Sequence, residues 1–596
     1  MVTQVVWFKR DLRVQDHQAL YHASCAGPVL CCYVLEQDYW QLPDTSNRQW
    51  LFVRDSLIEL SLQLEKLGGN LLVFKGDACE IFAELYQQLG TFVLHSHQET
   101  GNIRTYERDK AVAHWCRQHQ VSWFEYAQHA VLRGKAVFKP VNPSNKPLAT
   151  IAESARTANC EVGKTAVFSQ GTAISDSPFK QELRQNLSKP SSQQLRQKLS
   201  QQLSQQSSQK LNRPRHARAD WREHWYQFAK APLTPKPVLN TWDIAPLIAG
   251  LSRQSVAVFT RTKLEDFEHA NVKPDNLGPL ALDALPLQVR QDLYDCPNRQ
   301  IGGRHAAVAL FKSFLAERGG RYQATISSPL TAEIGCSRLS PHLANGTVSI
   351  RELLHQLDLT LAERTDRQWR RSLSAFQSRL VWHCHFIQKL ETNPNAELYN
   401  MQGLYNALDR PWQPERFAAW QHGRTGWPLV DACMRFLIAH GWLNFRMRAM
   451  LVSVACYTLK LPWQPVAHWL AQLFVDYEPG IHYPQIQMQS GTNGNQVLRI
   501  YNPLSQAQEL DPDGIFVRRW VTELQHVPTT WIFTPEKMPI QLKQQYGAEQ
   551  YPMPMVDFVI AHRAAKQEIS TLRNKTKAKN SEAEAREQFS LFAETL

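Results

Sequence analysis

The sequence predicts an α/β N-terminal domain with a parallel, Rossmann-like sheet, followed by a large all-α domain. Up to residue 135, short β-branched apolar runs alternate with amphipathic helical stretches, which is the pattern of βαβ units. From residue 219 to 565, apolar residues recur every three or four positions, as in packed helices. The length of 596 residues also requires at least two domains, because single cores stop growing near about 250–300 residues.

Five apolar runs in residues 1–135 are predicted as buried strands, and they are Val2–Phe8, Val29–Leu35, Leu71–Phe74, Phe92–His95 and Val121–Tyr126. Between the second and third, Trp50–Leu67 is predicted as a helix that ends at a Gly pair. No G-x-G-x-x-G follows the first run, so the dinucleotide fingerprint is missing. A ligand of this domain is expected at the carboxyl ends of its strands.

Residues 136–218 are predicted to be a linker with a Gln/Ser-rich insert. Leu residues spaced by multiples of four between Lys180 and Arg213 fit either a solvated helix or a disordered tether. This stretch carries a charge of +6, which is half of the net +12 of the chain. Residues 566–596, basic first and then acidic, are predicted to be a mobile tail.

Composition excludes several classes of protein. No apolar stretch is long enough to span a membrane, and charges follow the first apolar run too closely for a signal peptide, so a cytoplasmic protein is expected. The eleven Cys residues show no C-x-x-C and no finger-like spacing, so neither disulfides nor a metal site is expected. Ten of the 18 Trp residues lie between Trp369 and Trp531, which favours either large buried cores or a function for indole rings.

Several motifs resemble the photolyase/cryptochrome family, and most closely a divergent bacterial photolyase of cyclobutane pyrimidine dimers. The N-terminal motif is Val6–Arg13, VWFKRDLR, with Asp16-His17 after it. Three further motifs follow in order in the second half of the chain, and they are SRLSPHLANG at 337–346, GWPLVDACMR at 426–435 and RIYNP at 499–503. Only the insert falls outside this resemblance.

The resemblance implies FAD as cofactor, with a set of contacts on its phosphate side. The expected phosphate contacts are Tyr322, Cys336, Ser337, Arg338, Leu339 and Ser340. Hydroxyls and backbone N–H groups at a helix start suit a pyrophosphate, and they also suit an ordinary helix cap. Cys336 stands where Thr is common, so one hydroxyl contact is expected to be missing.

On the flavin side, the resemblance implies contacts from Trp442, Arg448, Asp476 and Glu478. An Arg–Asp pair there favours an anionic reduced flavin, because it places a cation near developing charge. An ungapped alignment puts His482 beside flavin N5, where its pKa near neutrality predicts pH-sensitive flavin chemistry. If the alignment slips by a residue, Tyr483 or Pro484 is nearer.

The electron path of the family is a chain of three Trp residues. Trp412 and Trp463 match its distal and middle members. The proximal position falls at Gln485–Ile486, which holds no aromatic residue. Photoreduction is therefore expected to take a detour, and the candidate stepping stones are Tyr483, Trp427, Trp442 and Trp469.

On the substrate side, Trp382 matches the Trp that stacks on the lesion, and a flat ring suits a flipped base. Arg379 replaces a Glu, so it is expected to act on both lesion and flavin as a fixed cation. His383 stands where the family has an Arg, and His383-Cys384-His385 is not expected to bind a metal because consecutive helical residues diverge. The other expected lesion contacts are Asn444, Phe445, Ala449 and Met488.

The resemblance implies a light-driven enzyme that uses FAD to split pyrimidine dimers in UV-damaged DNA, acting as a monomer without a membrane. An antenna pigment in residues 1–135 could be a folate, a deazaflavin or a flavin. The alternative is a cryptochrome-like blue-light receptor without repair activity, which the exchanges at Arg379, Phe445 and Ala449 favour. A relative acting on (6-4) products is the third hypothesis, but Asn444-Phe445 lacks the paired His of that group.

Overall fold

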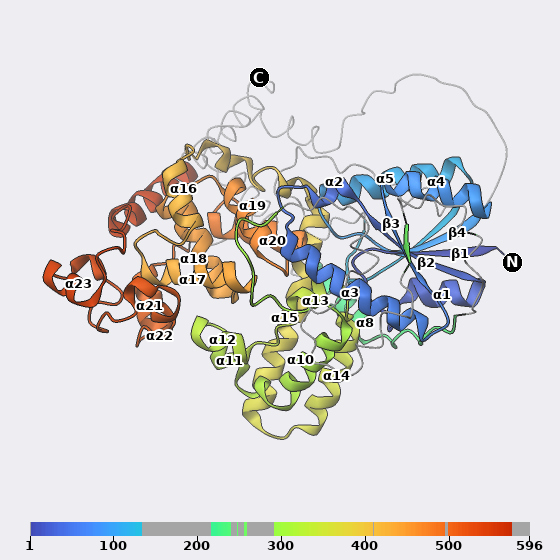
Figure 1. Ribbon diagram of the computed structural model, residues 1–596, viewed down its shortest axis with the longest axis horizontal. Coiled ribbons are helices and arrows are strands. Elements are labelled where there is room, and N and C mark those ends of the chain that lie inside the picture. Colours follow the sequence, from blue (N-terminus) through green and yellow to red (C-terminus); the bar gives the residue numbers. More distant parts are fainter. Residues whose placement is uncertain are drawn as a thin grey trace, which may run out of the picture.

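The computed structural model describes residues 2–133, 216–239, 247, 256–258, 291–408, 410–494 and 499–574. A sheet with helices on both faces is joined to a larger helical domain, as the sequence predicted (Figure 1). The Gln/Ser-rich insert and the tail beyond residue 574 lie outside the described residues. The predicted domain boundaries therefore stay predictions over most of the linker.

The N-terminal sheet has the strand order β5-β4-β1-β2-β3-β6. The first five strands are parallel to one another, which confirms the predicted sheet, and they are β1 Thr3–Phe8, β2 Val29–Leu35, β3 Leu71–Lys75, β4 Phe92–His97 and β5 Ser122–Tyr126. The sixth strand, β6 Val256–Val258, pairs antiparallel with β3. The expectation of a purely helical chain from residue 219 was wrong here, because this short run completes the open edge of the sheet.

Alternation along β1 divides the core of this domain in two. Val6 and Phe8 pack on one face, while Val5 and Trp7 pack on the other. The first face is covered by α1 and α3 and the second by α4 and α5 (Figure 1). The helices of the domain are α1 Gln18–Ala26, α2 Gln37–Trp40, α3 Asn47–Glu65, α4 Ala78–Leu89 and α5 Ile103–Gln118.

The helical domain encloses one large apolar cluster. Its longer helices are α8 His216–Lys230, α10 Arg304–Ala316, α14 Ile350–Glu363, α15 Arg367–Thr392, α16 Pro414–Gln421, α17 Pro428–His440, α18 Phe445–Ser453, α19 Trp463–Leu473, α20 Pro479–Ser490 and α21 Pro503–Leu510. Shorter helices are α11 Tyr322–Thr325, α12 Pro329–Gly335, α13 Ser340–Ala344, α22 Ile515–Trp520 and α23 Ile540–Tyr546. The 3-10 turns are η6 Arg318–Arg321, η7 Pro394–Glu397, η8 Gly403–Ala407, η10 Thr522–Leu524 and η11 Pro535–Lys537, and η9 Val454–Thr458 is a π-helical turn.

A last helix over residues 558–574 crosses the position where the tail was expected to begin. Ala565 and Ile569 of this helix are buried against Tyr405 and Tyr457. Residues 566–574 therefore pack on the helical domain. The tail prediction was wrong for them because their few apolar residues do not stand out in a basic sequence.

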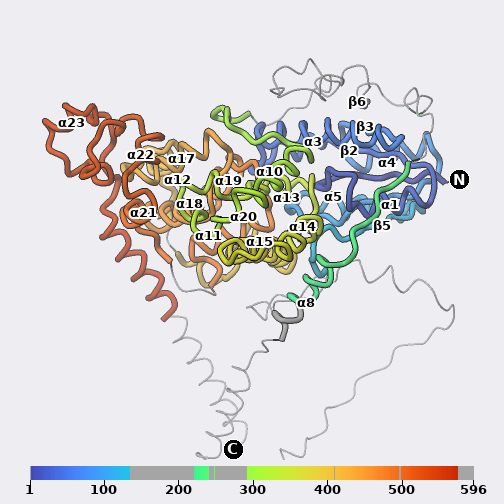
Figure 2. The backbone as a smooth tube through the Cα atoms, turned by 90° about the horizontal axis from the view of Figure 1, so that it is seen from below, coloured from blue at the N-terminus to red at the C-terminus, as the bar shows by residue number. Residues whose placement is uncertain are grey.

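Polar side chains of the first domain tie it to loops of the second. Arg48 on α3 is almost fully buried and donates to the carbonyls of Tyr294 (2.8 Å) and Ile438 (2.9 Å). Figure 2 shows α3 next to α10 at this boundary. Arg10, just after β1, donates to the carbonyls of Ala344 (2.9 Å) and Tyr477 (3.1 Å). The carboxyl end of the first strand thus lies against the segment that carries the predicted flavin-side residues.

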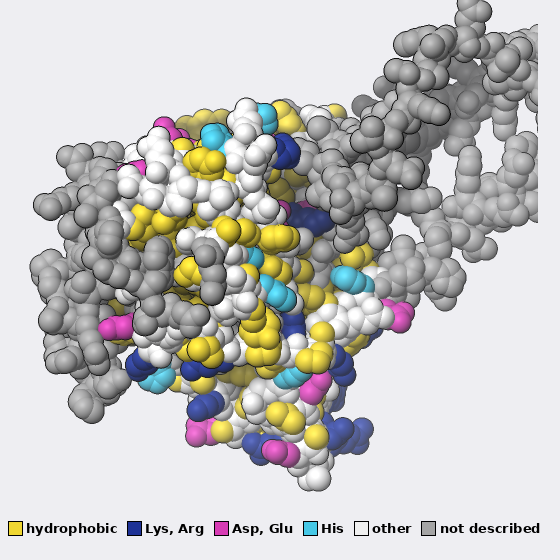
Figure 3. Space-filling view, turned by 90° about the vertical axis from the view of Figure 1, so that its right-hand side faces the viewer, with side chains coloured by type: hydrophobic (Ala, Val, Ile, Leu, Met, Phe, Trp, Pro, Cys, Tyr) yellow, Lys and Arg dark blue, Asp and Glu magenta, His cyan; other side chains and the backbone are white. Residues whose placement is uncertain are grey.

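No described helix combines the length and the apolarity that a bilayer crossing requires. On the face seen in Figure 3, the end formed by the N-terminal domain, the visible Lys and Arg side chains of the described residues are interspersed with Asp and Glu. The basic excess of the chain is thus not gathered into one patch on the visible part of this face.

Candidate functional site

Arg448 and Asp476 form a two-bonded ion pair between α18 and the segment after α19. Nη1 of Arg448 lies 3.0 Å from Oδ1 of Asp476, and Nη2 lies 2.7 Å from Oδ2. Nε of Arg448 donates to the carbonyl of Leu443 (2.6 Å), and its guanidinium lies 3.9 Å from the centre of the Phe474 ring. Arg446, two residues before Arg448, turns away and pairs with Glu509.

Burial sets the charge of two neighbouring groups. Glu478 is buried, its carboxylate lies 2.9 Å from Arg10, and burial raises its pKa to about 7 although Arg10 lowers it. His482 is buried, and burial lowers its pKa to about 3. The expectation that His482 titrates near neutral pH was therefore wrong. Its Nε2 donates to the carbonyl of Ala467 (2.9 Å), which leaves Nδ1 as an acceptor.

The expected phosphate loop lies between α12 and α13. Arg338 has a positive φ of 61°, and its guanidinium lies 4.1 Å from the centre of the Trp442 ring. The hydroxyl-bearing Ser337 and Ser340 are half-buried on either side of it, while Cys336 and Leu339 are buried. The helix that starts at Ser340 has only five residues, so the N–H groups and hydroxyls of the loop matter more than any helix dipole. Pyrophosphate binding here stays a prediction.

Arg379 connects the phosphate side to the surface. It lies on α15 near Tyr322, whose pKa is raised above its usual range by burial while the charge of Arg379 lowers it. Its guanidinium lies 4.8 Å from the centre of the Phe445 ring. Trp382 lies one turn further along α15, with its ring 5.6 Å from that of Phe386. Trp382 and Phe445 are 42% and 46% exposed, although most aromatic side chains of the described helical domain are covered.

The remaining predicted lesion contacts are less accessible. Asn444 is buried and donates to the carbonyls of Ile326 (3.1 Å) and Ser327 (2.8 Å), so it does not lie on the exposed aromatic surface. Ala449 is buried and Met488 is half-buried. An open groove of about 570 Å³ borders Phe445, and its lining includes Arg499 and Lys566.

The predicted electron-path residues differ in exposure. Trp412 is 52% exposed and packs on Phe417 at 5.0 Å, whereas Trp463 is buried and donates from Nε1 to Oδ1 of Asn400 (2.7 Å). Tyr483, one of the candidate stepping stones, is buried with its hydroxyl 3.4 Å from Oδ2 of Asp44. Tyr477 also donates to this carboxylate oxygen.

Sequence reasoning missed two residues of this region, Arg10 and Asp44, because both come from the other domain. A signal was present for Arg10, since polar residues directly after a parallel strand lie at its ligand-binding end. His383, half-buried on α15, has a pKa lowered to about 4 by burial and then by Arg10. It lies beside His129, another residue of the first domain.

The space for an antenna pigment at the carboxyl ends of β1 and β2 is small. The cavity there measures about 60 Å³, whereas pockets for drug-sized ligands start near about 300 Å³. Arg108 fills part of it and pairs with Glu36 (2.8 Å) and Glu99 (2.6 Å). An antenna pigment in this domain stays a prediction, and a flavin-sized one requires these side chains to move.

Comparisons with known proteins agree with this geometry. Residues 4–162 match the family model of DNA photolyase, and residues 376–571 match the FAD binding domain of DNA photolyase. A deoxyribodipyrimidine photo-lyase of Agrobacterium fabrum is 26% identical over 93% of this chain and 94% of its own length. A second one, of Alkalihalophilus pseudofirmus, is 28% identical over 51% of this chain and 62% of its own length.

The fold is also that of a solved relative. The crystal structure of a cryptochrome of Synechocystis covers 95% of this chain and 99% of its own, with a TM-score of 0.67 and 20% identity. Both halves of the chain thus match one family in the expected order, and the helical half carries that family's FAD-binding domain. The chain belongs to the photolyase/cryptochrome family.

Proposed function

We propose that this chain is a light-driven DNA repair enzyme, a photolyase that splits cyclobutane pyrimidine dimers with FAD. The observation that carries the proposal is the exposed pair Trp382 and Phe445 with the Arg379 guanidinium against one ring. Two flat rings and a cation at the surface of the FAD-binding domain suit a flipped pyrimidine dimer next to the flavin. The relatives named photo-lyase support the same reaction.

The residues present fit FAD. Oε1 of Glu478 and Oδ1 of Asn444 are buried and lack a hydrogen-bond partner within the described part of the chain, and a flavin with its ribityl chain offers donors for such atoms. Bound FAD supplies a light-driven electron donor to the lesion. Trp442, Arg448, Asp476 and Glu478 would hold the flavin side.

The charges in the site would set the electronic environment of the flavin. Arg448 keeps a cation near the ring system, and Asp476 holds that cation in place through two bonds. His482 stays neutral through its burial, so it offers Nδ1 as a hydrogen-bond acceptor over the whole physiological pH range. We infer that this site binds flavin with little pH dependence from His482.

On the substrate side, Trp382 and Phe445 would stack on the flipped bases. Arg379 would place a fixed positive charge beside the lesion, because guanidinium does not release a proton. Arg499 and Lys566 in the neighbouring groove would contact phosphates, so affinity for damaged DNA should fall steeply with added salt. We further infer that the protein acts as a monomer in the bacterial cytoplasm.

The deciding experiment illuminates the FAD-reduced protein with an oligonucleotide that contains one thymine dimer and follows the recovery of thymine absorbance. Recovery is expected in the wild type, and Trp382→Ala should slow it at sub-saturating DNA. Persistence of the dimer in the light, with fully reduced FAD bound, would contradict the proposal.

A cryptochrome-like blue-light receptor is the second candidate, and one observation favours it. The position of the family's acidic lesion contact holds Arg379, whose guanidinium packs against the ring of Phe445. A receptor should show light-dependent changes in protease sensitivity of the chain and no dimer splitting. Repair without such a change would exclude this candidate.

A further inference from the structure

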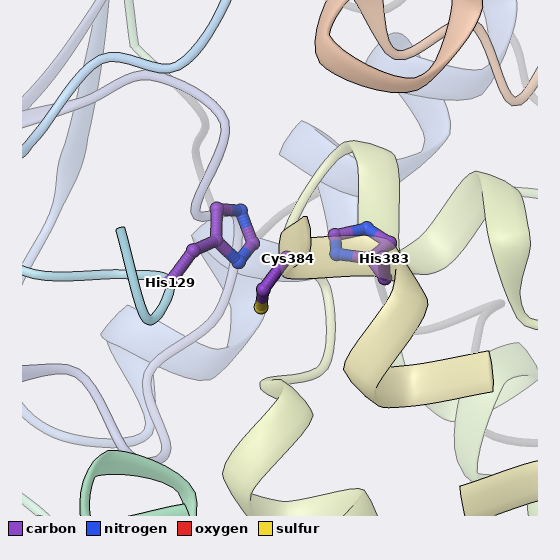
Figure 4. Close-up of side chains that lie close together, drawn as sticks. All are labelled: His129, His383 and Cys384. Carbon is purple, nitrogen blue, oxygen red and sulfur yellow. The ribbon is translucent and has the colours of Figure 1, made fainter. Parts of the chain in front are cut away.

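Three side chains with soft ligand atoms meet where the two domains touch. His129 follows β5 in the first domain, and His383 and Cys384 are neighbours on α15 (Figure 4). One ring nitrogen of each His and the sulfur of Cys384 all lie within 4.8 Å of one another. Cys384 is fully buried and His129 is 5% exposed.

The two imidazoles carry nitrogens that nothing else uses. Nδ1 of His129 and Nδ1 of His383 are buried without a hydrogen-bond partner in the described part of the protein. Each ring therefore keeps a buried nitrogen that is available to a ligand, and an imidazole nitrogen of this kind is a common metal ligand.

A second cluster, Asp11 with His17 and His97, gives a comparison. One oxygen of Asp11 lies 2.6 Å from His97 and 3.0 Å from His17, and its other oxygen accepts from the backbone N–H of Lys9. The remaining Nδ1 of His17 accepts from the N–H of Leu20. Nε2 of His17 forms no hydrogen bond within the described residues, but it faces the Asp11 carboxylate, and the other ligand atoms of the cluster are engaged, so it offers fewer spare ligand atoms.

Cys384 supplies the sulfur of this cluster. Its side chain is fully buried, and burial raises the pKa of the thiol to about 11. A bound cation would release the thiol proton to solvent and leave a thiolate.

We propose that His129, His383 and Cys384 form a transition-metal site and that Zn²⁺ is the ion it takes. Two imidazoles and a thiolate without a carboxylate suit Zn²⁺ and disfavour Mg²⁺ and Ca²⁺. Tetrahedral coordination with bonds of about 2.0–2.3 Å requires ligand atoms roughly 3.3–3.6 Å apart, so the cluster reaches it by small side-chain rotations. The fourth position is left for water.

The site differs from the one that the sequence argument dismissed. Consecutive helical residues do diverge, and His385 packs against Trp221 and Trp382 instead. His383 still reaches the sulfur of its neighbour, and the third ligand comes from the other domain. Arg10, the nearby cation, is neutralised by Glu478 at 2.9 Å, which limits its repulsion of a metal ion.

A metal here would link the loop after β5 to α15, and the inference does not depend on dimer repair. The test uses the full chain with FAD bound. The protein is stripped with a chelator, incubated with excess Zn²⁺, desalted and assayed by mass spectrometry of the metal. One Zn²⁺ per chain is expected for the wild type and for Cys433→Ala, a control for a buried Cys outside the cluster. Cys384→Ala and His129→Ala should retain none.

Two further measurements guard against variants that fail to fold. The wild type loaded with Co²⁺ should show a sulfur-to-cobalt charge-transfer band and tetrahedral visible bands, and Cys384→Ser, which keeps the side-chain volume, should lose the charge-transfer band. Circular dichroism of Cys384→Ser should match that of the wild type, so that a lost band reports the missing ligand and not unfolding. Equal zinc in the wild type and Cys384→Ser, or cobalt spectra without a sulfur band, would overturn the proposal.

Discussion

The Arg448–Asp476 pair gives the sharpest prediction for the flavin site. Asp476→Ala removes two charge-assisted bonds of 2.7 and 3.0 Å from a carboxylate that is 3% exposed. Breaking a buried pair from one side costs about 3–5 kcal/mol, since it leaves a buried charge. Because 27% of the Arg448 side chain is exposed and Leu443 still accepts from Nε, we expect the low end, about 3 kcal/mol.

The chain offers a matched control on the same helix. Arg446 pairs with Glu509 at 2.8 Å, but the Glu509 side chain is 54% exposed, so Glu509→Ala should cost less than about 1 kcal/mol. Asp476→Asn keeps one acceptor and should fall between the two. If Arg448 must be held in place to contact the flavin, a loss of about 3 kcal/mol corresponds to FAD binding about 100-fold weaker.

The assay has two readouts. Urea unfolding of the apoprotein, followed by circular dichroism, gives the stability of each variant, and titration of apoprotein with FAD gives its affinity. Asp476→Ala should lower both, while Glu509→Ala should leave both near wild type. Equal effects of the two substitutions, or a normal flavin affinity in Asp476→Ala, would refute the reasoning and show that the pair is an ordinary structural contact.

Three other predictions test the substrate surface, the electron path and a buried acid. Trp382→Ala should weaken binding of a dimer-containing oligonucleotide by about 1–3 kcal/mol in a titration, whereas Trp412→Ala, also an exposed indole, should not change it. Trp463→Phe and Tyr483→Phe should each slow photoreduction of bound FAD in transient absorption, and unchanged rates would remove that residue from the path. Burial raises the pKa of Glu478 from 4.5 to about 7, so the stability that this group contributes is complete below pH 4.5 and is lost as the pH rises to about 7. The free energy of unfolding of the apoprotein should therefore fall by up to about 3 kcal/mol over that range, and Glu478→Gln should flatten the profile.

Periodicity was enough to predict the fold class and the first five strands. Consecutive apolar residues such as Val5 and Val6, which point to opposite faces, mark β1 because both faces of a parallel sheet are covered. β6 escaped prediction because three residues carry no period, and its pairing with β3 depends on a contact far along the chain. Residues 566–574 of the last helix escaped because only a few positions, Ile569 among them, are buried in a largely polar stretch.

The site was predictable where the motif itself contains the contact and not where the contact joins two domains. The pairing of Arg448 with Asp476 follows from the resemblance, and only one helix and an adjoining segment separate the two residues. The partners of Glu478 and Tyr483, which are Arg10 and Asp44, lie more than four hundred residues away in sequence and could not be inferred from it. His482 was misjudged because its neutrality comes from burial, and burial is a property of the folded chain.

The position of Arg379 decides how a lesion could be stabilised in this site. An acid at that position could give a proton to a substrate that has gained an electron, whereas a guanidinium can only hold the charge by attraction and hydrogen bonding. Arg379 is exposed and contacts the ring of Phe445, so it can move toward a bound base without leaving a buried cavity. The charge of Arg379 also acts on Tyr322, one of the expected phosphate contacts, and lowers the pKa that burial raises. Substrate binding and flavin binding should therefore be coupled, and Arg379→Ala should reduce the dependence of dimer affinity on bound FAD.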